Sequence, residues 1–267
     1  MAGSIGGGLP AVVAWKQLEK TGEQQRARWE KQPSVQREIE FARSFAAKVT
    51  NVEEMLGNRR FMNFVLSAFG LESEVDKKGL LRKVLMSDLT DINSYANRMN
   101  DPRFQDLAQR LNLKADGVAN VKNEATLTSI ELRYKKNEFD KAQGEASPGL
   151  REAIYFKENA SRMKSIWDVL GDRTMRAVVS KAFDIPLETA VQSVESQAVA
   201  FGRKVDVEKF KDARWIDRTI QTYLTKVDQE TSQASGSAAS MYASLLTPLF
   251  DSGGGALDLL QGLSTRR

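Results

Sequence analysis

The chain contains neither histidine nor cysteine, so serine, lysine, arginine and carboxylate side chains are the groups that could do chemistry. Ser161 and Lys164 fit the S-x-x-K spacing, in which a lysine one helical turn away activates a serine hydroxyl for acyl transfer. No S-D-N element accompanies the pair, and Ala47 and Thr50 occupy the matching positions of an internal repeat described below. We therefore expect no catalytic residue here.

Four arginines share a second pattern, in which a helix-capping residue is followed by arginine and a large apolar residue. The four segments are Asn58-Arg59-Arg60-Phe61, Asp101-Pro102-Arg103-Phe104, Asp172-Arg173-Thr174-Met175 and Asp212-Ala213-Arg214-Trp215. Such a pattern is typical of a helix start with an arginine packed over an apolar anchor. The alternative is a ligand-binding set, and an enzyme would need Arg59, Arg103, Arg173 and Arg214 to converge with carboxylates in a pocket.

Metal, phosphate and cofactor sites are not predicted. Asp88, Asp91 and Asn93 are oxygen donors, but their spacing is not that of a calcium-binding loop, so helix capping explains them better. The glycines at 6–8 lack the preceding strand and following lysine of a phosphate-binding loop. The expected cofactor set is empty, and no small-molecule substrate is expected.

Nucleic-acid binding is a weaker alternative. The net charge is +4, from 39 basic and 35 acidic residues with both signs interleaved. The most basic segment also carries Trp15 and Trp29, but glutamates interrupt it at 19, 23, 30, 38 and 40. These carboxylates nearly cancel the release of counterions that drives binding to nucleic acids.

The periodicity that must position these residues is helical throughout. Apolar residues recur at helical spacing, and the Asn-Gly turns typical of hairpins are missing between them. We predict an all-α fold with helices over about 11–31, weakened at Gly22, and over 34–49. Gly57-Asn58 predicts a helix stop and a new start, with Gly57 in the left-handed conformation and Asn58 as the next cap.

Part of the chain occurs twice. Residues 37–72 align without a gap with residues 151–186, and identities include Leu56/Leu170, Gly57/Gly171 and Phe69/Phe183. The repeat predicts two related helical units. We expect an N-terminal leader and helix over 1–33, unit one over 34–117, a connecting helix over 118–147, unit two over 148–230 and a tail rich in Ser, Gly and Leu over 231–267.

The two ends of the chain are the best candidates for binding partners. The N-terminal segment lacks the pattern of a secretory signal peptide, and no apolar run approaches membrane-spanning length. The apolar segments 241–250 and 257–263 are too short to bury their own side chains, so they should dock on the core, a partner subunit or a membrane surface. The predicted partner-binding residues are Trp15, Met241, Tyr242, Leu245, Leu246, Leu257 and Leu260.

A family resemblance is carried by several short segments. They are Trp15-Lys16-Gln17-Leu18, Val35 to Phe41, Arg60-Phe61, Ala68-Phe69-Gly70-Leu71, Lys83-Val84-Leu85, Tyr95-Ala96-Asn97-Arg98-Met99 and Asp101-Pro102-Arg103-Phe104. From about residue 11 to residue 225 the chain resembles the domain-of-unknown-function family 1217, bacterial proteins often encoded beside flagellar genes. The resemblance implies an all-helical, flagellum-associated protein without known enzymatic activity, and it supplies no site residues.

The sequence therefore favours a non-enzymatic structural or assembly component of the bacterial flagellum. Its expected partners are other flagellar proteins or copies of itself. Its expected location is the flagellum, reached through the flagellar secretion channel, or otherwise the cytoplasm. The alternative function is a cytoplasmic chaperone or regulator of flagellar proteins.

Overall fold

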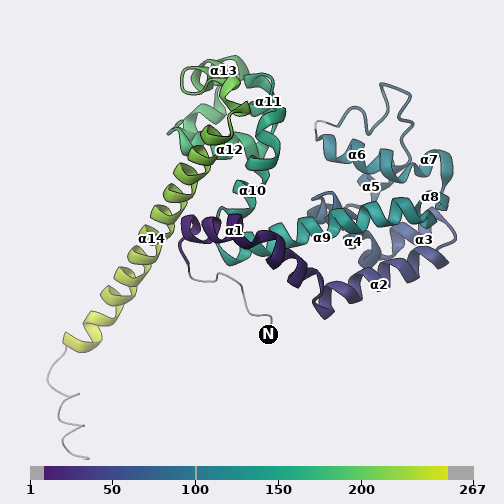
Figure 1. Ribbon diagram of the computed structural model, residues 1–267, viewed down its shortest axis with the longest axis horizontal. Helices are drawn as coiled ribbons and strands as arrows, with labels where there is room; N and C mark the ends of the chain where they lie inside the picture. Colours follow the sequence, from purple (N-terminus) through teal and green to yellow (C-terminus); the bar gives the residue numbers. More distant parts are fainter. Residues whose placement is uncertain (1–8, 100, 252–267) are drawn as a thin grey trace, which may run out of the picture. The chain divides into compact units, whose positions relative to one another are not determined.

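The computed structural model describes residues 9–99 and 101–251, with the backbone alone described for residue 187 and for 234–251. Every regular element in this part of the chain is an α-helix or a 3-10 helix, so the all-α prediction is confirmed. The chain divides into two compact units, Met1–Ile154 and Tyr155–Arg267. Figure 1 shows the helices of both units along the chain.

The helices of unit 1 follow in the order α1 (Ala11–Glu30), α2 (Pro33–Lys48), α3 (Val52–Gly57), α4 (Arg59–Ala68), η1 (Glu72–Glu74), α5 (Lys78–Leu85), α6 (Pro102–Leu111), α7 (Leu113–Asp116), α8 (Ala119–Lys122) and α9 (Glu124–Ala146). Two of these match the expected helices over 11–31 and 34–49. Gly22 does not interrupt α1, because a single glycine costs a helix only about 1 kcal/mol.

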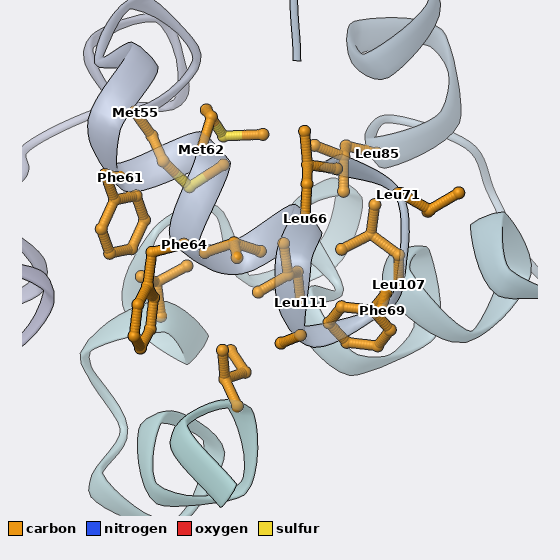
Figure 2. Close-up of a cluster of buried hydrophobic side chains, with 14 of the residues drawn as sticks. Met55, Phe61, Met62, Phe64, Leu66, Phe69, Leu71, Leu85, Leu107 and Leu111 are labelled. Atoms are coloured by element: carbon orange, nitrogen blue, oxygen red, sulfur yellow. The ribbon is translucent and has the colours of Figure 1, made fainter. Parts of the chain in front are cut away.

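Helix α4 is the centre of the unit 1 core. It is buried on most of its circumference, because α2, α3, η1 and α9 all pack on it. The rings of Phe64 on α4 and Tyr134 on α9 lie 4.3 Å apart between centroids. Figure 2 shows the apolar side chains around α4, which come from α3, α4, α5 and α6 and the turn after α4. Burial of these large side chains is the main source of stability in the unit.

Helix α9 belongs to this core. Residues 118–147 were expected to form one connecting helix, but α8 ends at Lys122 and α9 starts after Asn123, whose side chain accepts hydrogen bonds from the N–H groups of Ala125 and Thr126. Leu127, Ile130 and Tyr134 are buried against the rest of unit 1. The long helix is therefore a packed layer of unit 1, and the boundary between the units falls later, within α10 (Leu150–Asn159).

The elements of unit 2 follow α10 in the order η2 (Ala160–Arg162), α11 (Ile166–Gly171), α12 (Arg173–Ala182), η3 (Leu187–Val191), α13 (Val194–Gly202), η4 (Val207–Lys211) and α14 (Ala213–Asp251). Helix α12 packs on α11 and α14. Three aromatic side chains cluster in unit 2. The ring of Trp215 stacks on that of Phe183 with 5.7 Å between centroids, and its centroid lies 4.8 Å from that of Phe210.

The repeated segments form matching pairs of helices. Helices α3 and α11 each have 6 residues, and α4 and α12 each have 10. Asn58 and Asp172 both cap the second helix of the pair, as predicted. The prediction for Gly57 was wrong, because the left-handed residues lie further on, at Gly70 and Asp184. The chain leaves α3 at Asn58, whose backbone is extended. Gly57 is therefore still the last residue of the helix.

The change of composition after residue 230 does not end the last helix. Helix α14 continues from unit 2 through the serine- and alanine-rich segment to Asp251. Serine and alanine are compatible with a helix, and alanine favours it strongly. The first half of the expected tail is therefore helical, which places a continuous rod after the unit 2 core (Figure 1).

Candidate interaction surfaces

The predicted partner-binding residues have different environments. Trp15 is only 2% exposed, so it is part of the protein interior and offers no free surface, contrary to its predicted role. Met241, Tyr242, Leu245 and Leu246 lie on the helical backbone of α14. Leu257 and Leu260 lie outside the described residues.

Helix α14 is held in unit 2 by its N-terminal part. Among the α14 side chains that the structure describes, which run to residue 233, the buried ones recur at helical spacing: they are Ile216, Thr219, Ile220, Tyr223, Leu224 and Val227. Lys226 donates hydrogen bonds to the carbonyl oxygen of Ala182 and to Asp184. Lys181 forms an ion pair with Glu230. Residues 231–233 are exposed, so the described core contacts of α14 end near this point.

Beyond Val227 the helical backbone runs to Asp251, a length of about 36 Å at 1.5 Å per residue. Its core partner α12 has only 10 residues and spans about 15 Å. The C-terminal part of α14 therefore extends past the helix on which its N-terminal part is packed.

A second surface feature of unit 2 is a set of exposed apolar side chains on α11, η3 and α13, and α13 packs on both of the other elements. The exposed fractions are 51% for Trp167, 89% for Val191, 53% for Val194 and 54% for Val199. We call these four residues the α11–α13 face. Exposed apolar side chains that gather on neighbouring elements mark interaction sites more often than scattered ones do.

The four arginines of the capping pattern divide between the two units, two in each. Arg59 makes a two-bond ion pair with Asp76, at 2.9 and 3.0 Å. Arg103 donates to its own cap Asp101 and, at 2.5 Å, to the carbonyl oxygen of Gly70. Arg173 and Arg214 are exposed, and both belong to unit 2. In unit 1 the guanidinium groups of Arg59 and Arg103 therefore stabilise turns through hydrogen bonds, which fits a structural role for the pattern.

An open groove of about 340 Å³ lies beside α4, η1 and α9 in unit 1. Its walls carry both signs of charge, with Arg59 and Lys141 near Glu72, Asp76 and Glu138. Tyr134 also lines the groove, and burial, with the nearby charge of Glu138, raises the pKa of its phenol well above the ordinary value. A phenol that stays protonated is no base or nucleophile at neutral pH.

The other candidate motifs are explained by local structure. Ser161 lies in the short turn η2, and the backbone N–H of Lys164 donates to the carboxylate of Asp168. The serine acyl-transfer pattern also includes a K-T-G triplet, and the chain has one at 20–22. This triplet lies inside α1, where the Thr21 hydroxyl donates a hydrogen bond to the carbonyl oxygen of Gln17.

The remaining oxygen-donor cluster forms turns. Asp88 and Asp91 accept hydrogen bonds from the backbone N–H groups of Thr90 and Asn93. Among the described residues, no three carboxylates gather as metal ligands would. Helices long and apolar enough to cross a bilayer are likewise missing from the described ranges.

Comparison with known families gives a match over residues 68–216, which is more than half of the chain, to the family described as "Protein of unknown function (DUF1217)". The chain belongs to the DUF1217 family. The match covers helices of both units, from the end of α4 to the start of α14. No curated protein matches the chain.

A solved structure confirms that this fold occurs elsewhere. The X-ray crystal structure of a protein from Agrobacterium tumefaciens, a structural genomics target, matches with a TM-score of 0.67 and 24% identity. The match covers 83% of this chain and 95% of that one. At this identity the likeness concerns the DUF1217 fold alone.

Proposed function

We propose that this protein is a non-enzymatic structural or assembly component that works through protein–protein contacts in the bacterial flagellum. The observation that carries the proposal is the extension of α14 about 36 Å beyond Val227, the last residue of the helix described as buried. Isolated helices are marginal in water, and most helical stability in proteins comes from packing. A partner chain that packs on this extension would stabilise it.

The chemistry of the surface supports a binding role over a catalytic one. Arg59 and Arg103 are engaged by carboxylates and a backbone carbonyl, and Tyr134 has a raised pKa. Without histidine, the chain also lacks the side chain that most often serves as general base. The partners that we propose for these helices are other flagellar proteins or further copies of this chain.

The flagellar setting is the part of the proposal that depends on the family resemblance, through the association of its members with flagellar genes. Export through the flagellar secretion channel would suit a chain without disulfide bonds, because such a chain can pass unfolded. A strain with that channel blocked should then retain the protein in the cell. Release from the blocked strain would contradict export by this route.

The decisive experiment is mass spectrometry of intact flagella purified with hook and basal body, compared with the same preparation from a deletion strain. A structural component should be present at stoichiometric abundance. Absence from the organelle, with the protein found in the cytoplasm bound to flagellar subunits, would contradict the structural role and favour a chaperone or regulator.

A further inference from the structure

The most apolar helix of unit 2 is covered on one side only. In α13 the side chains of Gln197, Ala198 and Phe201 are buried, whereas Val194 and Val199 are about half exposed. Glu195 is the only charged residue of this helix. A helix with apolar residues around most of its circumference is normally buried all round. Val191 just before α13 and Trp167 on the neighbouring α11 extend the exposed apolar set to the α11–α13 face.

The sequence after α14 supplies a segment with complementary composition. Residues 252–255 are Ser-Gly-Gly-Gly, which lets the chain leave the helix axis, and Leu257, Leu259, Leu260 and Leu263 follow within a short stretch. The chain ends with Arg266 and Arg267. Glu188 and Glu195 are exposed and lie within three residues, in sequence, of Val191 and Val194, so they provide opposite charges for these arginines.

The length of α14 argues against this segment covering the face of its own chain. Helix α13 precedes the start of α14 by a short stretch containing η4, which packs on α14. From there α14 leads away from α13 (Figure 1). The helix has 39 residues and is therefore about 58 Å long at 1.5 Å per residue. Leu263, the last residue of this segment, lies 12 residues after Asp251 and reaches at most about 43 Å from it when the chain is fully extended, which is less than the length of α14. A second molecule needs no such return.

We propose that the α11–α13 face binds the Leu257–Leu263 segment of a second copy of this chain. The contact joins two different surfaces, the face of one molecule and the C-terminal segment of the next. Such a heterologous contact repeats from molecule to molecule and builds a linear assembly unless the rotation closes a ring. This inference rests on the proposed function, since it names the chain itself as the partner of an assembly protein.

The test measures self-association of the full chain by sedimentation velocity over a range of concentrations. Val199→Glu and Val191→Asp each place a charge on the face and should weaken association by about tenfold or more, because one apolar side chain loses its burial. Removal of residues 252–267 should abolish association. Ile92→Asp is the matched control, because Ile92 is 81% exposed and belongs to unit 1, whereas the face belongs to unit 2. Circular dichroism checks that every variant is folded.

A mixing experiment makes the test specific. The Val199→Glu chain has an intact C-terminal segment, and the chain shortened to residue 251 has an intact face. At a concentration where the Val199→Glu chain alone is monomeric, mixing the two chains should form a complex of one copy each that grows no further. Unchanged association of the shortened chain, or no complex in the mixture, would overturn the inference.

These outcomes are distinct from those of the proposed function. If the protein is abundant in purified flagella but monomeric at every concentration, the role in the flagellum stands and self-association through this face is wrong. If association depends on the face and the C-terminal segment but the protein is absent from flagella, this inference stands and the flagellar role is wrong.

Discussion

Two carboxylates at matching positions of the repeat fix the starts of helices α3 and α11. Glu54 accepts a hydrogen bond from the backbone N–H of Thr50 at 2.8 Å. Asp168 accepts from the N–H groups of Lys164 and Ser165, each at 2.9 Å. These bonds lower the pKa of both carboxyls, because they favour the charged form. The same local chemistry thus sets the same turn in both units.

We predict that acid weakens unit 2 partly through Asp168. Its pKa in the folded protein lies below the ordinary value of 3.8, so its contribution to stability is present above that value. The contribution is lost as the pH falls from there through the lower folded pKa. Asp168→Asn should therefore lose less stability than the wild type between about pH 5 and about pH 3, as measured by urea unfolding.

The control for this experiment is Glu145→Gln, which changes an exposed carboxylate on α9. It should keep the wild-type dependence on acid. If wild type and Asp168→Asn lose equal stability over the same range, Asp168 has no part in the acid response.

The turn after helix α4 depends on one glycine, Gly70. Gly70 has φ of 67°, and the N–H of Leu71 bonds back to the carbonyl oxygen of Leu66 at 2.9 Å, which closes the helix end. Arg103 at the start of α6 donates to the carbonyl oxygen of Gly70. The end of one helix and the start of another are thereby joined.

Gly70→Ala should lower the free energy of unfolding by about 1–2 kcal/mol, because an L side chain is strained at positive φ. The added Cβ would also lie 3.4 Å from Nη1 of Arg103. Gly57→Ala is the matched control, since Gly57 has no positive φ and nothing within 4 Å of an added Cβ. Urea unfolding measures both variants. Equal effects of the two substitutions would contradict the role of the turn.

Helices α2 and α9 are joined by an ion pair at the edge of the core. The guanidinium of Arg43 lies 2.5 Å from the carboxylate of Glu131, whose side chain is only 8% exposed, and 2.7 Å from that of Glu124. A buried carboxylate is costly unless a partner compensates its charge.

Arg43→Met should destabilise the protein by about 2 kcal/mol, between the values for exposed and fully buried pairs, because it leaves Glu131 uncompensated. The double variant Arg43→Met with Glu131→Leu should recover most of this loss, since it removes both charges together. Urea unfolding of the two single variants and the double variant measures the coupling. Additive losses would show that the ion pair does not join the helices.

In the whole molecule, helix α14 contains two consecutive segments of different character. Up to Val227 its buried side chains complete the unit 2 core. From there to Asp251 the helical backbone continues past α12, and the composition changes to small residues and then to apolar ones. The part of α14 that completes the core and the part that we propose binds a partner are therefore consecutive in the chain.

We predict that a chain ended after Gln233 folds with the thermal stability of the full chain, within about 4 °C. This cut keeps every α14 side chain described as buried and the ion pair between Lys181 and Glu230. A second cut after Lys211 removes α14 and should unfold unit 2, because α12 loses its partner. Scanning calorimetry measures both. A large loss of stability in the longer chain would show that the extension belongs to the core.

Features that depend on residues close together in the chain could be predicted from the amino-acid sequence. Periodicity predicted helices α1 and α2, and the capping residues Asn58 and Asp172 marked two further starts, because a cap bonds N–H groups only two or three residues away. The family was also recognised from short segments, and the match over residues 68–216 confirmed it.

Which surfaces pack together could not be predicted from the sequence and became clear from the folded structure. Trp15 carries an apolar signal that is the same for a core residue and a partner contact, and its burial was settled by packing. The role of α9 depended on α4, which lies far away in sequence, and the exposure of Val199 depended on which face of α13 met α11. Burial is a property of neighbours brought together by the whole fold, so no local pattern fixes it.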